Sequence, residues 1–251
     1  ITILNFKVSM KNKMTSNEIL SLAREVMYVE SDAIKNVADS LNESFYDACK
    51  LILGSNGKLI TIGIGKSGHI ARKISATLSS TGTSSFFINA ADASHGDLGM
   101  ISPTDIILAM SYSGETQELI SILPSLKKMN IKLISITGDP KSTLAKASDS
   151  HILVEIEKEA CPLNLAPTAS TTASLAVGDA LAATLTECRN FSSEDFAKSH
   201  PSGSLGKRLL LKVSDIMHTG DKIPTIKPSQ MLSKGLIEIS QKNLGMVAII
   251  D

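Results

Sequence analysis

Between residues 58 and 188, short apolar runs alternate with helix-length segments, and this alternation leaves few possible folds. The runs are rich in Ile, Val and Leu, show little alternation with polar residues, and occupy residues 58–64, 85–88, 105–110, 132–137 and 151–156. Strands of this kind are buried on both faces, which is typical of parallel sheets covered by helices. We therefore expect a doubly wound α/β domain with a mostly five-stranded parallel sheet of flavodoxin-like kind.

Residues 17–41 have the three- and four-residue apolar spacing of a helix, and the other segments between and beside the runs have the length and composition of helices. Helices are predicted over residues 17–41, 44–53, 68–81, 116–129, 142–147 and 170–188. A polar, turn-rich loop follows at Ser199–Leu205, and residues 213–251 then read as a small helix-and-strand unit. A unit of about 40 residues is marginal as an independent core. The predicted domains are residues 17–206 and an incomplete second domain, 212–251.

The charge balance, the lengths of the apolar runs and the spacing of the cysteines indicate which binding partners and which cellular compartment to expect. The chain has 251 residues, of which 43% are hydrophobic, and its 25 Lys and Arg balance 25 Asp and Glu, so the net charge is +0. This balance argues against nucleic-acid binding, which needs clustered cations. No apolar run approaches the ~20 residues of a membrane span. The three cysteines lie far apart without a CxxC pair, so we expect reduced thiols and a cytoplasmic protein.

The first motif that could carry chemistry is Gly63–Gly68, placed between a predicted strand and a predicted helix. Glycines let the backbone approach a phosphate, and a helix N-terminus offers unpaired N–H groups. Lys66 and Ser67 add an ammonium group and a hydroxyl. A tight strand-to-helix turn without a ligand is one alternative. A dinucleotide site is another, with Asp92 as the acidic residue that such a site needs.

The second motif, Ser111–Thr116, again joins a predicted strand to a predicted helix. It contains a glycine and the hydroxyl groups of Ser111, Ser113 and Thr116. Helix capping by Ser113 would use one hydroxyl and leave the others unexplained. Because parallel strands end at one edge of the sheet, the two motifs should converge there. We therefore predict a site for a small phosphate ester.

Four ionisable residues belong to the same prediction. Glu118 lies in the first turn of the helix after the second motif, Glu159 follows the last strand, and His95 and His200 lie in loops. Loop histidines are commonly surface residues, and a glutamate in a first helical turn commonly complements the helix dipole. Glu118 and Glu159 are stronger candidates because both follow strand ends.

Several of these segments together resemble the sugar-isomerase (SIS) domain of D-arabinose 5-phosphate isomerases. The matching motifs are Gly63–Gly68, Ser113–Glu115, Lys158–Leu163, Ala166–Thr172 and Ser199–Pro201. Val213–Gly220 resembles the start of the paired CBS module of these enzymes, and the chain ends inside the first repeat. The resemblance implies interconversion of D-ribulose 5-phosphate and D-arabinose 5-phosphate, which supplies Kdo for lipopolysaccharide. It also implies a homotetramer with active sites between subunits.

The resemblance also implies roles for individual residues. It places Lys66, Glu118, Glu159 and His200 in the active site, His95 at a substrate-binding position, and Gly82 and Thr83 in a sugar-contacting turn. Asn89 occupies a position where the family often has a histidine linked to zinc, and an amide is a poorer zinc ligand than imidazole. We expect Asn89 to contact substrate, and we expect no bound metal and no cofactor.

The residue types suit aldose–ketose isomerisation through a cis-enediol by general acid–base catalysis. Glu159 and His200 are the predicted proton carriers, in an order that the sequence leaves open, and Glu159 would need burial to become an effective base. Lys66 would neutralise negative charge, and Glu118 would hold Lys66 or a sugar hydroxyl. Ser67, Ser111, Ser113 and Thr116 would bind the phosphate. The alternatives are a non-catalytic phosphosugar-binding regulator, another SIS phosphosugar isomerase, and an NAD-dependent enzyme.

Overall fold

The computed structural model describes residues 14–200 and 211–251 of the chain. It divides into two compact units, Ile1–Phe196 and Ala197–Asp251, and each is described by itself. The predicted boundary between residues 206 and 212 falls largely outside the described residues.

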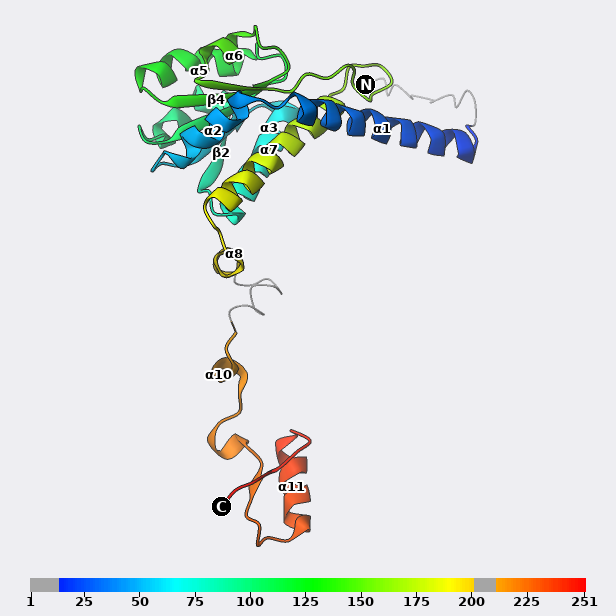
Figure 1. The fold of residues 1–251 in the computed structure, drawn as a ribbon, viewed down its shortest axis with the longest axis vertical. Helices are drawn as coiled ribbons and strands as arrows, with labels where there is room; N and C mark the ends of the chain where they lie inside the picture. Colours follow the sequence, from blue (N-terminus) through cyan, green and yellow to red (C-terminus); the bar gives the residue numbers. More distant parts are fainter. Residues whose placement is uncertain (1–13, 201–210) are drawn as a thin grey trace, which may run out of the picture. The chain divides into compact units, whose positions relative to one another are not determined.

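Unit 1 is built on a parallel sheet of five strands (Figure 1). The strand order is β2-β1-β3-β4-β5, which confirms the doubly wound, flavodoxin-like fold. All neighbouring strands pair in parallel. The strands are β1 (Leu59–Gly63), β2 (Ser85–Asn89), β3 (Ile106–Met110), β4 (Lys132–Thr137) and β5 (Ser150–Leu153). The chain changes direction across the sheet between β1 and β3, where folds of this class bind ligands.

Helices cover both faces of this sheet because side chains of successive strand residues point to opposite faces. Leu59 and Leu108 belong to one buried cluster, whereas Ile60 and Ile107 belong to the other. The first cluster packs against α1 (Ser16–Ser40), α2 (Glu43–Leu53), α3 (Gly65–Ser80) and α7 (Ala169–Cys188). The second packs against α4 (Ala90–Ala93), α5 (Gln117–Lys128) and α6 (Thr143–Ala147). Short helices η1 (Asp97–Met100) and α8 (Ser193–Ser199) complete the elements that begin in unit 1.

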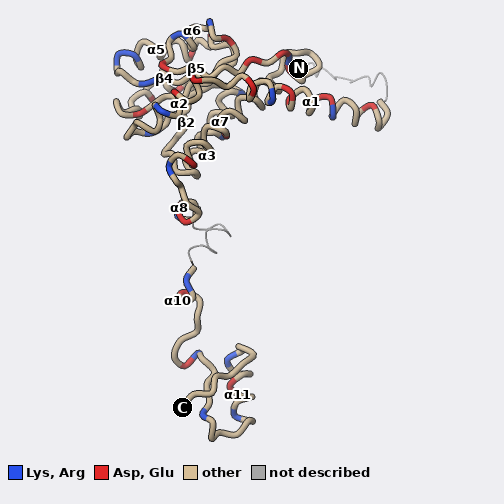
Figure 2. Tube along the Cα trace, viewed as in Figure 1, with Lys and Arg blue, Asp and Glu red and all other residues tan. Residues whose placement is uncertain are grey.

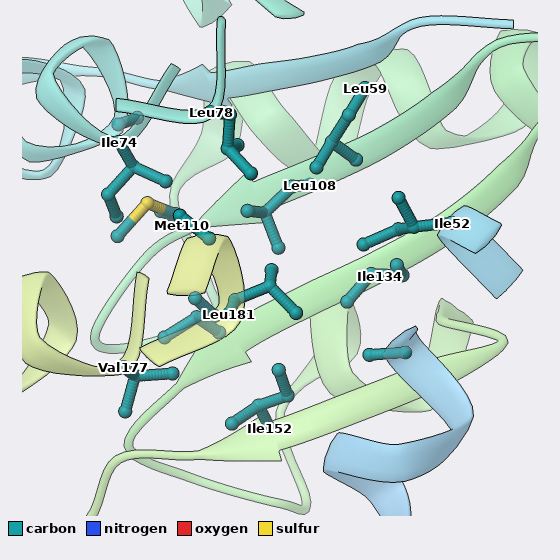
Figure 3. Close-up of a cluster of buried hydrophobic side chains, with 14 of the residues drawn as sticks. Ile52, Leu59, Ile74, Leu78, Leu108, Met110, Ile134, Ile152, Val177 and Leu181 are labelled. Atoms are coloured by element: carbon teal, nitrogen blue, oxygen red, sulfur yellow. The ribbon is translucent and has the colours of Figure 1, made fainter. Parts of the chain in front are cut away.

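Helix α7 packs along the first cluster (Figure 3). Val177 and Leu181 on α7 belong to the same buried cluster as Leu108, Ile134 and Ile152 on three different strands. Burying a side chain of this size contributes about 1.5–3 kcal/mol each. This packing fixes where the N-terminus of α7 meets the carboxyl edge of the sheet, and that edge holds the candidate site.

Three local features differ from the predictions. Helix α3 begins at Gly65 and not at residue 68, so Lys66 and Ser67 lie in its first turn. Strand β5 ends at Leu153, although the Val154 N–H still donates to the Thr137 carbonyl oxygen at 2.8 Å. Residues 90–93 and 97–100 form α4 and η1, which were not predicted, because elements of four residues are too short to show a helical period.

Unit 2 contains a small strand–helix–strand arrangement. Strands β6 (Thr225–Ile226) and β7 (Ala248–Ile249) pair in parallel, and α11 (Leu232–Lys242) connects them and packs against β6. The short helices α10 (Val213–Ile216) and η2 (Gly220–Lys222) precede β6. This agrees with the predicted helix-and-strand character of the region.

Basic and acidic residues are interspersed along both units (Figure 2), in keeping with the zero net charge. Among the helices of the described residues, none combines the length and apolar character needed to cross a membrane.

Candidate active site

The first predicted motif forms the junction between β1 and α3. Ile64 is the N-cap of α3, and its side chain makes no capping hydrogen bond. The first N–H groups of a helix lack partners within the helix and point outward with a partial positive charge. Lys66 is exposed and Ser67 half-buried in this turn. The motif therefore forms a tight turn whose helix end can accept an anion.

The second motif gathers its hydroxyl groups into one cluster. Ser111 Oγ lies 2.7 Å from Thr116 Oγ1 and 3.5 Å from Ser113 Oγ. Thr116 is the N-cap of α5, and its side chain does not cap the helix. Capping of α5 by Ser113 is therefore not what the structure shows. The three hydroxyls remain grouped at a helix N-terminus, which suits contact with phosphate oxygens.

Contacts with α6 hold this second turn in place. Gly114 has φ +64°, and a Cβ there would come within 2.1 Å of Ser142 Oγ, so only glycine fits. The Gly114 carbonyl accepts the Leu144 N–H at 3.1 Å, and Glu115 Oε1 accepts the Thr143 N–H at 2.6 Å. Glu115 therefore has a structural partner at the N-terminus of α6.

Glu159 lies in the segment between β5 and α7, and both of its carboxylate oxygens are held. Oε2 accepts the Thr168 N–H at 2.8 Å, Thr168 Oγ1 at 3.1 Å and the Ser170 N–H at 3.2 Å, while Oε1 accepts Ser170 Oγ. Burial acts to raise the pKa of Glu159, but these hydrogen bonds to the ionised form outweigh it, so the pKa is lowered. An effective base would need a raised pKa. Burial acts in that direction, but the hydrogen bonds outweigh its effect and keep Glu159 ionised.

Tyr112 connects the second turn to the segment that carries Glu159. Burial raises the pKa of its phenol, the Ile156 N–H lowers it by donating to the oxygen, and the negative charges of Glu159 and Glu155 raise it further, with a net rise. The phenol therefore stays neutral and keeps its proton near Glu159. Tyr112, Thr168 and Ser170 are not among the site residues predicted from the sequence. The clustering of hydroxyl residues at the start of α7 was the available signal for the latter two.

A small cavity joins these parts at the carboxyl edge of the sheet. Its lining includes Ser67 from the first turn, Ser111 and Tyr112 from the second, and Ser170 beside Glu159. Its volume is about 30 Å³, which is room for about one water molecule. It is therefore the floor of a site and not a complete sugar pocket. Two larger cavities, about 720 and 630 Å³, are lined by none of the predicted site residues.

Three further predicted residues lie after strands at this same edge. Asn89 ends β2 opposite Gly63 of β1, and its Oδ1 accepts the Ala91 N–H at 2.9 Å as the N-cap of α4. His95 is exposed between α4 and η1, and Glu118 is half-buried in the first turn of α5. In the described part of the chain, no three His, Cys, Asp or Glu side chains group as a metal site would require.

Two predicted substrate contacts lie elsewhere. Gly82 and Thr83 precede β2 and line a cavity of about 200 Å³ with Lys58 and Arg189, at the amino edge of the sheet. Within one chain they cannot join the residues that follow the strands, because a turn before a parallel strand lies at the opposite edge. His200 follows α8, where its N–H donates to the Ala197 carbonyl at 3.1 Å, and it belongs to unit 2. The geometry of unit 1 therefore does not include His200.

Comparison with known proteins identifies the family. The model of the SIS domain matches residues 52–184. Arabinose 5-phosphate isomerase KdsD of Salmonella typhi is 51% identical over 228 residues, covering 91% of this chain and 70% of the relative. KdsD of Pseudomonas aeruginosa is 47% identical over 240 residues, covering 96% of this chain and 74% of the relative.

A solved structure agrees with these relatives. The structure of E. coli CFT073 c3406 in complex with arabinose 5-phosphate has a TM-score of 0.73 and 43% sequence identity, and covers 75% of this chain and 100% of that chain. The predicted resemblance to the SIS domain of arabinose 5-phosphate isomerases is thereby confirmed. The chain belongs to the SIS-domain family of arabinose 5-phosphate isomerases.

Proposed function

We propose that this chain interconverts D-ribulose 5-phosphate and D-arabinose 5-phosphate through a cis-enediol, in the supply of Kdo. The observation that supports it best is the small cavity that the two strand-end turns share. Ser170, which donates a hydrogen bond to the Glu159 carboxylate, lines the same cavity. Hydroxyls and helix N-termini suit the phosphate, and a carboxylate suits proton removal from the carbon beside a carbonyl.

The roles of the site residues belong to this proposal. Glu159 and His200 are the two proton carriers. Lys66 offsets the charge of the enediolate, Glu118 holds Lys66 or a sugar hydroxyl, and Asn89 and His95 contact the sugar. Ser67, Ser111, Ser113 and Thr116 bind the phosphate. Gly82 and Thr83 would require a second subunit to reach a sugar, because they lie at the opposite edge of their own sheet.

A homotetramer is part of the same proposal, and the exposed apolar residues of α1 support it. Ile19, Met27 and Tyr28 are 55%, 70% and 66% exposed. Exposed apolar residues gathered on one helix commonly mark a protein–protein contact. The mass in solution, measured by light scattering, should be four times that of the chain. Met27→Lys should lower it, whereas a monomeric wild type would contradict the proposal.

The assignment of residues 212–251 to an incomplete CBS repeat also remains a proposal. The parallel β6-α11-β7 arrangement supports it.

The proposed reaction is tested by incubating the full chain with D-ribulose 5-phosphate in D₂O and following the products by NMR. We expect an aldose that carries deuterium at the carbon that receives the proton. Glu159→Gln should lower kcat about 10²–10⁴-fold with little change in KM. Glu157→Gln, two residues away and exposed, is the matched control and should behave as wild type.

The alternatives give different results in the same assay. A phosphosugar-binding regulator would bind the sugar without turnover. A different SIS isomerase would leave ribulose 5-phosphate unchanged and convert a heptose or hexulose phosphate. Either outcome would refute the proposed reaction.

A further inference from the structure

Ala166–Thr172 matches the family, but the proposed reaction gives this motif no role. Two of its residues, Thr168 and Ser170, supply every hydrogen bond that the described structure gives to the Glu159 carboxylate. Two of these bonds come from backbone N–H groups and two from hydroxyls. All four donors to the Glu159 carboxylate therefore come from this one motif.

The hydroxyl of Thr168 is committed to the loop that carries Glu159. Thr168 is the N-cap of α7, but its side chain makes no capping bond to the helix. Its Oγ1 instead accepts the N–H groups of Ala160 at 2.8 Å and Cys161 at 3.3 Å while donating to Glu159. An ordinary helix cap would use this oxygen on the first turn of its own helix. Here it ties the loop to the helix.

Ser170 makes the simpler contact. The residue is 1% exposed, and its Oγ donates to Glu159 Oε1. The N-terminus of α7, a helix of 20 residues, adds a partial positive charge on the same side. Together these groups fix the orientation of the carboxylate and favour its charged form.

We propose that Thr168 and Ser170 are positioning residues that hold Glu159 as a fixed carboxylate, so that it serves as the proton acceptor of the isomerisation. This inference rests on the proposed function. It assigns the first proton transfer from sugar carbon to Glu159 and leaves the opposite transfer to another group. In that step the C–H bond breaks, the proton passes to a Glu159 oxygen, and the electron pair forms the double bond of the enediol.

The electrostatics agree with this geometry. Burial alone would raise the pKa of Glu159, but the bonds from Ser170 and Thr168 lower it. Burial raises the pKa of the Tyr112 phenol, and the negative charge of Glu159 raises it further, so the phenol stays neutral. Cys161 lies in the same loop, where N–H groups of residues 163–166 lower the pKa of its thiol, the Ala166 N–H most of all. At neutral pH the carboxylate is therefore ionised. The same hydrogen bonds weaken it as a base, so their contribution to the proton transfer is a fixed orientation of the carboxylate oxygens.

A purely structural role makes a different prediction. If Glu159 only stabilised the N-terminus of α7, removal of the Ser170 hydroxyl would lower the free energy of unfolding and leave the pH dependence of kcat unchanged. The pH profile therefore separates a positioning role from a structural one.

The test compares Ser170→Ala with wild type in the full chain, by measuring kcat and KM for ribulose 5-phosphate between about pH 3.5 and pH 9, because the pKa of Glu159 is lowered from the ordinary glutamate range. Removing a donor to an ionised group destabilises the charged form. We expect the acidic limb of the kcat profile to move to higher pH, kcat at pH 7 to fall roughly tenfold, and KM to change less than about twofold. Thr186→Val is the control, because it removes a hydroxyl from the far end of the same helix, and it should retain the wild-type profile.

A second pair of variants protects the test against a folding defect in Ser170→Ala. Thr168→Ser keeps the hydroxyl and should retain the wild-type profile, whereas Thr168→Val should shift it in the same direction as Ser170→Ala. Wild-type profiles in both Ser170→Ala and Thr168→Val would overturn the inference.

NMR titration of ¹³C-labelled glutamate carboxyl groups makes the outcome independent of turnover. The Glu159 resonance is identified by its loss in Glu159→Gln, and it should titrate at higher pH in Ser170→Ala. Absence of isomerisation by wild type would refute the proposed function alone. An unchanged Glu159 titration in Ser170→Ala would refute the positioning role even in an active enzyme.

Discussion

The ring of Tyr112 lies directly against Gly138, the residue that follows β4. A Cβ built on Gly138 would come within 2.5 Å of the ring, so no other residue fits without moving it. The Gly138 N–H donates to the Tyr112 carbonyl oxygen at 2.7 Å, which joins the ends of β3 and β4. The ring thereby reaches across β4 toward Ile156 and the segment that carries Glu159.

Gly138→Ala should destabilise the protein by about 1–3 kcal/mol, because the added methyl group overpacks the ring of Tyr112. In a Tyr112→Ala background the same substitution should cost much less, since the clashing ring is absent. Urea unfolding of the four proteins in this double-mutant cycle measures the coupling free energy. Additive effects of the two substitutions would show that the contact does not restrict residue 138.

Tyr112→Phe should lower kcat/KM about three- to tenfold and lower the free energy of unfolding by only about 1 kcal/mol, the cost of one lost hydrogen bond. The variant keeps the ring against Gly138 but removes the oxygen that accepts the Ile156 N–H and faces Glu159. Steady-state kinetics and thermal unfolding, measured together, check both parts. Tyr46→Phe, an exposed tyrosine on α2, is the control. Full activity in Tyr112→Phe would show that the phenol oxygen does not contribute to catalysis.

Ser113→Ala should raise KM about five- to tenfold with kcat within about twofold of wild type. Its hydroxyl is exposed beside Ser111 at the second turn, where it would contact the phosphate in ground and transition states alike. Ser125→Ala, on the exposed side of α5, provides the matched control. A fall in kcat with constant KM would instead place Ser113 near the reacting carbons.

The free energy of unfolding should decrease as the pH falls, because protonation of His151 favours the unfolded chain. Burial lowers the pKa of His151, although a hydrogen bond to the Thr137 backbone and the nearby negative charge of Asp139 both act to raise it. The unfolded chain therefore binds a proton at higher pH than the folded protein does. The contribution of His151 is full above the ordinary histidine pKa of about 6.5 and is lost as pH falls through the lower folded value.

Urea unfolding of wild type and His151→Asn between pH 5 and pH 8 checks this. The difference in unfolding free energy between the two proteins should shrink as the pH falls. A difference independent of pH would show that His151 does not titrate with unfolding.

The cysteines should react with iodoacetamide in a defined order. Hydrogen bonds from N–H groups of its own loop, led by that of Ala166, lower the pKa of the Cys161 thiol, whereas burial raises that of Cys49 to about 11. Because the thiolate is the reactive form, Cys161 should be alkylated well before Cys49 at pH 7. Peptide mass spectrometry of time points measures the order, and denatured protein serves as the control. Equal rates in the native protein would contradict it.

Much of the fold follows from local sequence patterns. The apolar runs predicted all five strands of unit 1, because residues buried on both faces of a sheet must be apolar along the whole strand. The length and composition of the segments that form α5 and α7 are equally local. The helix start at Gly65 and the short α4 were missed because the N-terminal residues of α3 and four-residue elements carry no period.

The candidate site divides in the same way. Ser67, Ser111 and Glu159 could be singled out because each follows a predicted strand, and parallel strands end together. Thr83 also belongs to a family motif, but its turn precedes a strand, and only the sheet showed that it lies at the opposite edge. A sequence motif predicts which residues have a function, but it does not predict which of them lie close together within one chain.

By itself, the sequence determined the strand-and-helix alternation, the doubly wound class and the two glycine-containing turns, because spacing and residue type act over a few neighbouring positions. Only the tertiary structure decided that Ser170 and Thr168 donate hydrogen bonds to the Glu159 carboxylate. It also decided that the ring of Tyr112 packs against Gly138 at the end of β4. Those contacts depend on how α7 and the strand ends pack, and packing brings together residues whose separation along the chain carries no local signal.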